Sequence, residues 1–340
     1  MIAKYRFVLC CAAVLFSGLL WFSAARAGQG DPGDSDPVFS KVYAYVNTVG
    51  SKVPVYATAA DAASNTAPVR ELDGYEWVTI ITTTQVNTAT LAQIGVNEWV
   101  PADRLALYRP SQFQGRSFDQ QAAPDQPIAW VLRDFQPALM PDGDINPDAP
   151  IYKRYTVVTI YEKALAGDTL WYRIGENQWC RQQTLGVVAP RSAPAGVNIS
   201  DRLHGKWISI NLYEQTIAAY EGEKLVYASL VSSGLPQWET VKGLFRIQIK
   251  NRLQPMYNAA GDPDLGQYHL DDVPFNMFFY TDYALHGAYW HDGFGYPHSR
   301  GCVNLSLHDA QWFYNWTLPS GPYNYVQASA RKPGTWVWVH

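Results

Sequence analysis

The sequence predicts a mainly β protein, and three observations support this. Short runs of aliphatic and aromatic residues recur along the chain, and turn-forming Gly, Pro, Asn and Asp residues separate them. Aromatic side chains, which suit sheet surfaces, are frequent, with 13 Trp and 22 Tyr. Helix signals are few, and the best lies at 306–316, where Ser306 and Asp309 have the spacing of a capping box.

The composition indicates a folded chain of more than one domain. The 340 residues suit two or three domains. Hydrophobic residues make up 47% and charged residues 16%, which excludes a disordered chain. The formal net charge of -4 provides no global basic field that would attract nucleic acid or anionic lipid. We therefore expect no nucleic-acid partner.

The N-terminal residues have the pattern of an export signal. Lys4 and Arg6 precede a mostly apolar run at 7–25, and Ala25 and Ala27 are small residues at the positions that a signal peptidase reads. We expect cleavage after Ala27, so that 1–27 is a signal peptide. The alternative is an uncleaved membrane anchor, because the run is nearly long enough to span a bilayer. Both place the rest of the chain outside the cytoplasm, in the periplasm, cell wall or extracellular space.

Two segments of the chain resemble each other. Each opens with a short apolar and aromatic run, at 42–46 and at 128–132. Each ends in a Gly-x-Asn-x-Trp sequence, at 95–99 and at 175–179. This internal repeat predicts two small β units of the same kind.

We place these two units at 39–112 and 125–190, after a flexible leader at 28–38 that is rich in Gly, Asp and Pro. Their strand spacing and Trp endings resemble bacterial SH3-like modules, which are small β-barrels. The resemblance implies contact with peptides, glycan or another wall polymer. A spacer that holds the last domain away from the membrane is the alternative, since a fold does not define a function.

The two cysteines that follow the export signal call for different interpretations. Exported proteins usually pair their cysteines or lack them, so a disulfide between Cys180 and Cys302 is one alternative. The repeat aligns Cys180 with Val100, which predicts a small buried residue in a strand. The residues around Cys302 indicate chemistry instead.

A third domain is predicted at 200–340. A connector with Pro, Ala and Ser precedes it, and strand patterns at 207–212, 216–220 and 225–231 form a meander. The predicted helix at 306–316 would bury Leu307, Ala310, Phe313 and Trp316 on one face, and 335–339 reads as a closing strand.

The segment 285–305 carries the clearest chemical signal. A thiol becomes a useful nucleophile when a neighbouring imidazole accepts its proton. Fifteen residues separate His286 from Cys302, a loop length that can bring two neighbouring strands together. Gly301 lets the backbone approach a substrate closely, and the main-chain amides of Arg300, Gly301 and Cys302 could face a developing oxyanion. We therefore predict a cysteine nucleophile.

Two motifs in this segment resemble the L,D-transpeptidase (YkuD) family, and the resemblance covers roughly 200–340. The family's apolar-His-Gly strand is matched by Leu285-His286-Gly287, and its Ser/Thr-His-Gly-Cys-apolar-Asn motif by Ser299-Arg300-Gly301-Cys302-Val303-Asn304. Arg300 stands where many members carry a second His, although Lys and Arg occur there too. A permanent positive charge at that position should favour the thiolate.

The resemblance implies a role for each matching residue. Cys302 attacks the donor carbonyl, His286 takes the thiol proton and later serves the acceptor amine, and the Gly287 carbonyl orients the His286 ring. Ser299 braces the turn, and Asn304 hydrogen-bonds the loop. Four aromatic residues are candidates for the groove wall, although core packing would explain any of them: Tyr289, Trp290, Phe294 and Tyr296.

The resemblance also implies a fold and a reaction. The expected fold is a sandwich- or barrel-like β-domain with one supporting helix, preceded by two SH3-like β-barrel modules. The expected donor is a peptidoglycan tetrapeptide stem, cleaved after its third, meso-diaminopimelyl-type residue with release of D-Ala. The acyl group then passes to an amine on another stem, as peptidoglycan biosynthesis, cell-wall organisation and cell shape require. The reaction needs no cofactor and no metal.

Other acceptors would change the activity but keep the nucleophile. With water the enzyme is an L,D-carboxypeptidase, and with a protein lysine it anchors a protein to the wall. Because a transferase must shield its thioester from water, we expect a lid, and 254–272 is the candidate.

Two alternatives belong to other classes. His269, His286, His291, His298 and Cys302 include enough ligands for zinc, but their spacing fits no familiar zinc motif, and Gly and Pro exclude a helical His pair. A non-catalytic wall-binding protein would suit the SH3-like modules. An inactive descendant, however, has no need of an exposed thiol outside the cell.

Overall fold

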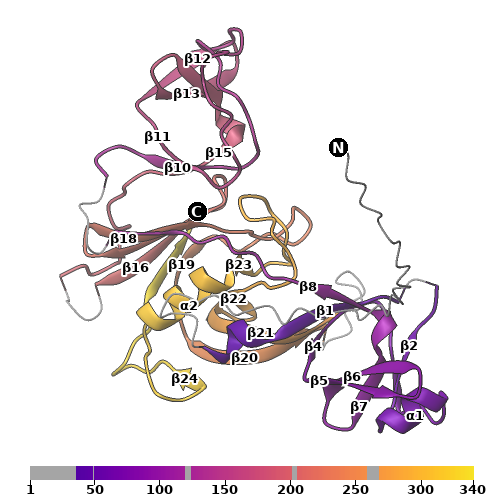
Figure 1. Ribbon diagram of the computed structural model, residues 1–340. Coiled ribbons are helices and arrows are strands. Elements are labelled where there is room, and N and C mark those ends of the chain that lie inside the picture. Colours follow the sequence, from indigo (N-terminus) through magenta and orange to yellow (C-terminus); the bar gives the residue numbers. More distant parts are fainter. Residues whose placement is uncertain (1–35, 49, 119–123, 201–204, 259–267) are drawn as a thin grey trace, which may run out of the picture. The chain divides into compact units, whose positions relative to one another are not determined.

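The computed structural model describes residues 36–48, 50–118, 124–200, 205–258 and 268–340. The predicted signal peptide, most of the leader and the centre of the candidate lid lie outside the described residues. The chain divides into two compact units, Met1–Phe39 and Ser40–His340, and the second holds all the strands and helices described below. It is mainly β, as predicted (Figure 1).

The first repeat folds around a small core of its own. A short helix that the sequence analysis missed, α1 (Ala59–Ser64), is capped by Thr58, whose side chain accepts from the amide of Asp61. The core consists of buried aliphatic residues such as Val46, Val78 and Val100. The strands are β1 (Val42–Val46), β2 (Val53–Val55), β3 (Arg70–Leu72), β4 (Tyr75–Ile80), β5 (Thr82–Val86), β6 (Ala89–Gly95), β7 (Glu98–Pro101) and β8 (Leu105–Tyr108).

The second repeat has the same strand order as the first. Its sheets run β11-β10-β15 and β12-β13-β14, and the first repeat has β4-β1-β8 and β5-β6-β7. Cys180 pairs with Tyr172, just as Val100 pairs with Ala92, and both Cys180 and Val100 are buried. The internal repeat is therefore confirmed. The strands are β10 (Ile128–Val131), β11 (Val157–Thr159), β12 (Glu162–Ala166), β13 (Thr169–Gly175), β14 (Gln178–Arg181) and β15 (Leu185–Val188).

A six-stranded sheet in the order β19-β25-β16-β17-β18-β9 forms one part of the C-terminal region. It contains the predicted meander and the predicted closing strand. Its core includes Trp207 stacked on Tyr220, and also Phe113 and Trp130, which precede the C-terminal region in the sequence. The strands are β9 (Arg116–Ser117), β16 (Lys206–Asn211), β17 (Thr216–Glu221), β18 (Lys224–Leu230), β19 (Gly243–Arg246) and β25 (Trp336–Val339).

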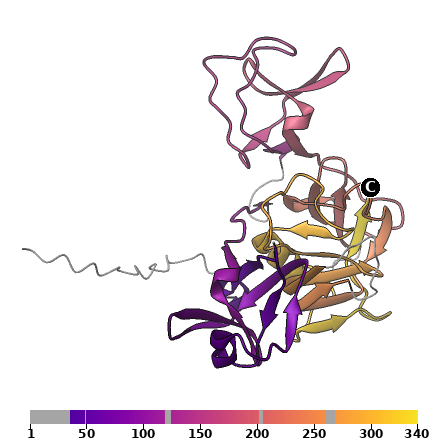
Figure 2. The same cartoon turned by 90° about the vertical axis from the view of Figure 1, so that its right-hand side faces the viewer.

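The second C-terminal sheet continues into the first repeat (Figures 1 and 2). β4 lies parallel to β21, and Tyr75, Glu76 and Trp77 pair with Tyr268, His269 and Leu270 in turn. The β20–β21 hairpin frames the candidate lid. The remaining strands are β20 (Ile249–Tyr257), β21 (Tyr268–Tyr280), β22 (Tyr283–Gly287), β23 (Val303–Leu305) and β24 (Tyr325–Gln327). The domain limits and the SH3-like resemblance stay predictions.

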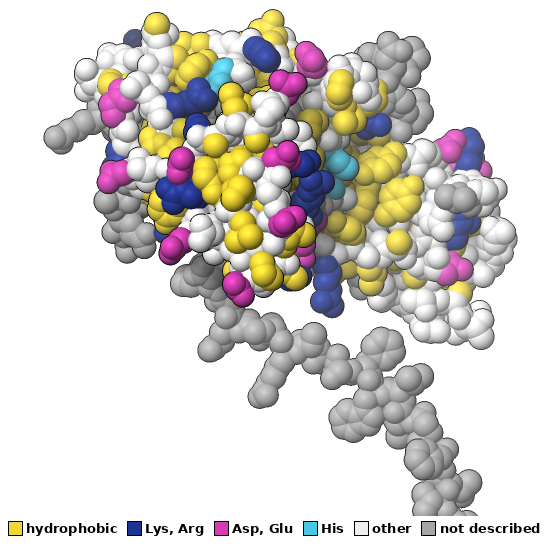
Figure 3. Space-filling view, turned by 90° about the horizontal axis from the view of Figure 1, so that it is seen from above, with side chains coloured by type: hydrophobic (Ala, Val, Ile, Leu, Met, Phe, Trp, Pro, Cys, Tyr) yellow, Lys and Arg dark blue, Asp and Glu magenta, His cyan; other side chains and the backbone are white. Residues whose placement is uncertain are grey.

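The predicted helix is α2 (Leu307–Trp316), and Ser306 caps it by accepting from the Asp309 amide at 3.1 Å. Leu307, Ala310 and Phe313 are buried as predicted, but Trp316 is only half-buried. No helix among the described residues is long and apolar enough to cross a membrane. On the face seen in Figure 3, basic and acidic side chains are interspersed among hydrophobic ones.

Asp309 does more than begin the helix. Its buried carboxylate accepts from Tyr227 Oη at 2.7 Å, from Ser229 Oγ and from the Gly115 amide at 2.8 Å. These donors lie on β18 and on the segment before β9, so one carboxylate joins α2 to the six-stranded sheet. Burial raises the pKa of Asp309, and the hydrogen bonds act in the opposite direction.

We predict that Asp309→Ala lowers the free energy of unfolding by about 2–4 kcal/mol, because it leaves three buried donors without an acceptor. Urea unfolding followed by fluorescence measures the change. Asn315→Ala, at an exposed position of the same helix, is the matched control and should cost less than about 0.5 kcal/mol. Equal effects of the two substitutions would contradict this role for Asp309.

Candidate active site

His286 and Cys302 come together through the parallel pairing of β22 and β23. His286 pairs with Asn304. Side chains alternate along a strand, so Cys302, two residues before Asn304, faces the same side of the sheet. All three side chains line one cavity of about 690 Å³. The imidazole and the thiol therefore line the same cavity, His286 from β22 and Cys302 from the position directly before β23.

The His286 ring is buried and held by its own strand. Its Nδ1 lies 3.1 Å from the Gly287 carbonyl oxygen. A carbonyl oxygen only accepts, so Nδ1 carries the proton and Nε2 is free to accept another. Burial lowers the pKa of His286 to about 4, and the bond to Gly287 partly offsets this effect. The ring is thus a neutral acceptor at neutral pH, oriented as we expected.

The Cys302 thiol is half-buried, and its Sγ lies 3.6 Å from the carbonyl oxygen of Asp282. Burial raises the pKa of Cys302 to about 11; a backbone hydrogen bond from Ala284 lowers it, and the charge of Asp282 raises it further. The expectation that Arg300 would favour the thiolate was wrong. Its guanidinium instead lies over the rings of Tyr268 and Trp238.

Ser299 and Gly301 shape the turn before Cys302. Ser299 Oγ donates to the Cys302 carbonyl oxygen and accepts from the Gly301 amide at 3.1 Å, so Ser299 braces the turn as predicted. Gly301 has a φ of +117°, and a Cβ there would meet the Tyr283 ring at 2.8 Å. Because the Gly301 amide already donates to Ser299, its predicted role in an oxyanion site is wrong. The amides of Arg300 and Cys302 remain the candidates.

Asn304 contacts the loop, as the resemblance implied, through its neighbour His291. Its Nδ2 lies 3.0 Å from His291 Nε2, while His291 Nδ1 accepts from the Gly293 amide. A neutral imidazole carries one proton, so His291 Nε2 must donate. The Asn304 side-chain amide must therefore be turned so that its oxygen, and not its nitrogen, faces Nε2 and accepts. Burial is the main cause that lowers the pKa of His291 to about 3, which keeps this ring neutral.

Only one of the four predicted groove aromatics, Trp290, lines the cavity; its ring centroid lies 5.7 Å from that of His286. Tyr289 is fully buried, stacks on Tyr43 and donates to the Asp271 carbonyl oxygen. Phe294 is fully buried against Phe113. Tyr296 is exposed but lies outside the cavity wall. The predictions for Tyr289 and Phe294 were wrong because hydrophobic character alone does not distinguish a groove from a core, and the prediction for Tyr296 was wrong because its side chain lies at the surface outside the cavity.

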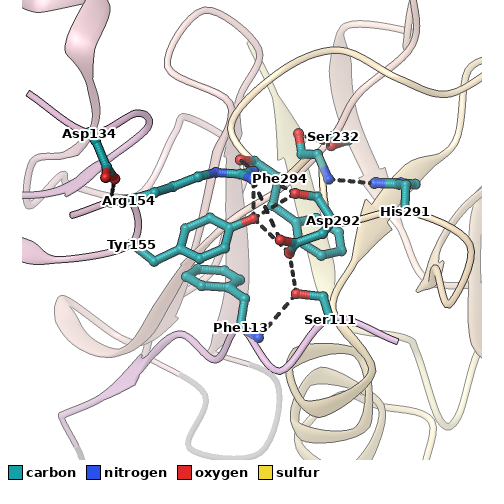
Figure 4. A network of polar contacts seen from close by, with 10 residues as sticks. Ser111, Phe113, Asp134, Arg154, Tyr155, Ser232, His291, Asp292 and Phe294 are labelled. Carbon is teal, nitrogen blue, oxygen red and sulfur yellow. Dashed lines mark hydrogen bonds and ion pairs between the residues drawn. The ribbon is translucent and has the colours of Figure 1, made fainter. Parts of the chain in front are cut away.

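Asp292, in the loop between His286 and Cys302, is held by residues that the sequence analysis did not single out (Figure 4). Tyr155 Oη donates to its carboxylate at 2.9 Å, Ser111 Oγ donates to the same oxygen, and Arg154 Nη1 lies 3.5 Å from the other. Arg154 Nη2 also donates to the Asp292 carbonyl oxygen. Arg154 and Tyr155 of the second repeat and Ser111, which follows β8, therefore anchor the loop. No short-range sequence signal predicts contacts of such long range.

The geometry bears on two alternatives for these residues, a disulfide between the cysteines and a zinc site that includes the histidines. Cys180 and Cys302 are both free thiols, so the disulfide alternative was wrong. Within the described ranges, no three His, Cys, Asp or Glu side chains are arranged to hold a metal ion. His291 and His298 do lie close together, with ring centroids 4.1 Å apart, but they form part of the loop packing.

We predict that iodoacetamide alkylates Cys302 slowly at pH 7. The rate should rise about tenfold per pH unit up to pH 9, because the raised pKa leaves little thiolate. Intact-protein mass follows the reaction, and Cys302→Ala reveals any labelling of buried Cys180. A rate that is already constant at pH 7 would instead show a preformed thiolate–imidazolium pair.

The comparisons with known proteins agree with the C-terminal site. Residues 205–339 match the L,D-transpeptidase catalytic domain family, YkuD. A search of curated proteins finds no match.

Solved structures of similar proteins include L,D-transpeptidases from three bacteria. A C442S mutant from Enterococcus faecium is 18% identical over 40% of this chain and 49% of its own, with a TM-score of 0.32. One from Mycobacterium smegmatis is 19% identical over 56% of this chain and 75% of its own (TM-score 0.33). One from Mycobacterium tuberculosis H37Rv is 19% identical over 56% and 74% (TM-score 0.31). The chain spans about half the length of the first of these. The match to the YkuD catalytic domain family covers residues 205–339, and this range includes His286 and Cys302.

Proposed function

We propose that this protein is an exported peptidoglycan L,D-transpeptidase that cross-links stem peptides through a thioester on Cys302. The observation that carries the proposal is the pairing of β22 with β23, which places a neutral imidazole and a thiol on one wall of the cavity. The cavity volume of about 690 Å³ lies within the usual range for ligand sites. The match of 205–339 to the family supports the same reaction.

Thioester formation begins from a neutral pair. His286 Nε2 takes the proton of the Cys302 thiol as Sγ attacks the carbonyl carbon of the donor. The oxyanion faces the amides of Arg300 and Cys302. When the tetrahedral intermediate collapses, the C–N bond breaks and the imidazolium returns its proton to the leaving amine, which departs as D-Ala. Because the resting thiol has a raised pKa and His286 a lowered one, the proton moves only with the attack.

The second half of the reaction transfers the acyl group from Cys302 to an amine, and His286 again accepts and returns a proton. The amine of an acceptor stem attacks the thioester carbonyl, and His286 Nε2 takes a proton from the new ammonium group. The C–S bond then breaks, and the imidazolium protonates the departing thiolate. The products are a new amide cross-link and the free Cys302 thiol. The buried setting of His286 keeps the ring neutral between the two steps.

Two further functions would use the same nucleophile, namely an L,D-carboxypeptidase and an enzyme that anchors proteins to the wall. Export through the segment 1–27 and wall contact through the two repeats are parts of the proposal. The products distinguish these activities. A cross-linked dimer indicates the transpeptidase, a tripeptide stem indicates the carboxypeptidase, and a stem–lysine adduct indicates the anchoring enzyme.

We predict that a carbapenem adds its mass once to the protein without residues 1–27, and that Cys302→Ala forms no adduct. His286→Ala should slow acylation by at least about 100-fold, because it removes the proton acceptor. Intact-protein mass spectrometry measures both effects. Cys180→Ala is the matched control and should acylate normally, since Cys180 is buried in β14. An adduct on Cys302→Ala would contradict the assignment of Cys302 as the acylated residue. No adduct on either form would favour a non-catalytic wall-binding protein.

A further inference from the structure

We propose that Arg300 and Tyr75 form a carboxylate-binding subsite in the Cys302 cavity, which selects donor peptides with a free C-terminal carboxylate directly beyond the scissile bond. The inference rests on the proposed function and deepens it. Tyr75 belongs to the first repeat and lies outside the matched range 205–339. The subsite therefore assigns the recognition of the leaving residue partly to the first repeat.

Two aromatic rings orient the Arg300 side chain. Its guanidinium carbon lies 4.5 Å from the centre of the Tyr268 ring and 5.3 Å from that of the Trp238 ring. Such contacts orient the planar group and leave its N–H donors available. Among the described residues, no carboxylate lies within ion-pair distance of Arg300. An exposed guanidinium on the cavity wall, oriented by two rings and with N–H donors that no described residue uses, suits a carboxylate that binds through both oxygens.

The charge of the cavity wall agrees with a carboxylate ligand. Asp282 and Arg300 are its two charged side chains within the described part of the chain, and Arg300 is the cation. His286 has a pKa of about 4, and the pKa of His298 is lowered by burial, so neither ring supplies a positive charge at neutral pH. An anionic group that enters the cavity therefore meets its favourable partner at Arg300.

Tyr75 reaches the same cavity from the first repeat. The parallel pairing of β4 with β21 places Tyr75 beside Tyr268, and both side chains line the cavity wall. Burial raises the pKa of Tyr75, whereas a side-chain hydrogen bond with Trp77 and the charge of Arg300 lower it. A phenol hydroxyl in that position can donate a hydrogen bond to a carboxylate held by Arg300.

The position of the subsite identifies which carboxylate it binds. Arg300 is two residues before Cys302, and the charges of both Cys302 and Arg300 act on Tyr268. An extended peptide advances by about 3.3–3.6 Å per residue. The terminal carboxylate of a single leaving residue therefore lies one residue from the scissile carbonyl, a distance that the long Arg300 side chain can span. A donor that ends in a carboxamide offers no charge to this subsite.

The experiment compares two donor stems that differ only in the terminal group, a free carboxylate or a carboxamide. We expect the protein to prefer the carboxylate about 10- to 100-fold in kcat/KM. Arg300→Gln should reduce this preference to less than about threefold, Arg300→Lys should restore part of it, and Tyr75→Phe should lower it by about three- to tenfold. A merely structural role of Arg300 would lower both rates and leave their ratio unchanged.

Arg181→Gln is the matched control, because Arg181 lies over the Trp171 ring at 5.3 Å in the second repeat, outside the cavity. It should keep the full preference. Equal use of both donors by the unaltered protein would overturn the subsite, as would an unchanged preference in Arg300→Gln. If Arg300→Gln turns over neither donor, the test rests on the carboxylate-to-carboxamide ratio of kcat/KM in the unaltered protein and in Arg300→Lys. A lower ratio in Arg300→Lys supports the subsite, and an equal ratio overturns it. If the unaltered protein turns over neither donor and forms no carbapenem adduct, the proposed function fails instead.

Discussion

His286 and Cys302 lie together because β22 and β23 run side by side in parallel, although fifteen residues separate the two side chains in sequence. Several residues of the loop that makes this return are held by contacts with other segments. Phe294 is fully buried against Phe113, Asp292 is bound by Tyr155 and Ser111, and His291 contacts Asn304. The geometry of the reacting pair therefore depends on contacts made far from the reacting atoms.

Desolvation governs the chemistry of the pair more strongly than any neighbouring charge. It lowers the pKa of His286 to about 4 and raises that of Cys302 to about 11, so the resting state carries no net charge on either group. A neutral thiol is less prone to oxidation than a thiolate, because oxidation follows thiolate character.

The two repeats are more than spacers in this arrangement. The first extends the catalytic sheet through β4, and the second anchors the loop through Arg154 and Tyr155. In the first case the contact brings Tyr75 to the cavity wall. In the second case the contacts hold Asp292, in the loop that leads to Cys302. A bulky residue at Gly301 would break the turn even with these supports, because of its positive φ and the nearby Tyr283 ring.

Local patterns in the sequence were sufficient for the mainly β class, the internal repeat, the helix at 306–316 and the His286–Cys302 pair, because each is set by spacing within a short segment. The helix α1, the buried settings of Tyr289 and Phe294, and the bond from the Gly301 amide to Ser299 could not be predicted in this way. The position of Arg300 between two rings and the arrival of Tyr75 in the cavity depend on segments about 30 to 225 residues away along the chain. Only the tertiary structure decides such contacts, because burial and long-range strand pairing arise from the packing of the whole chain.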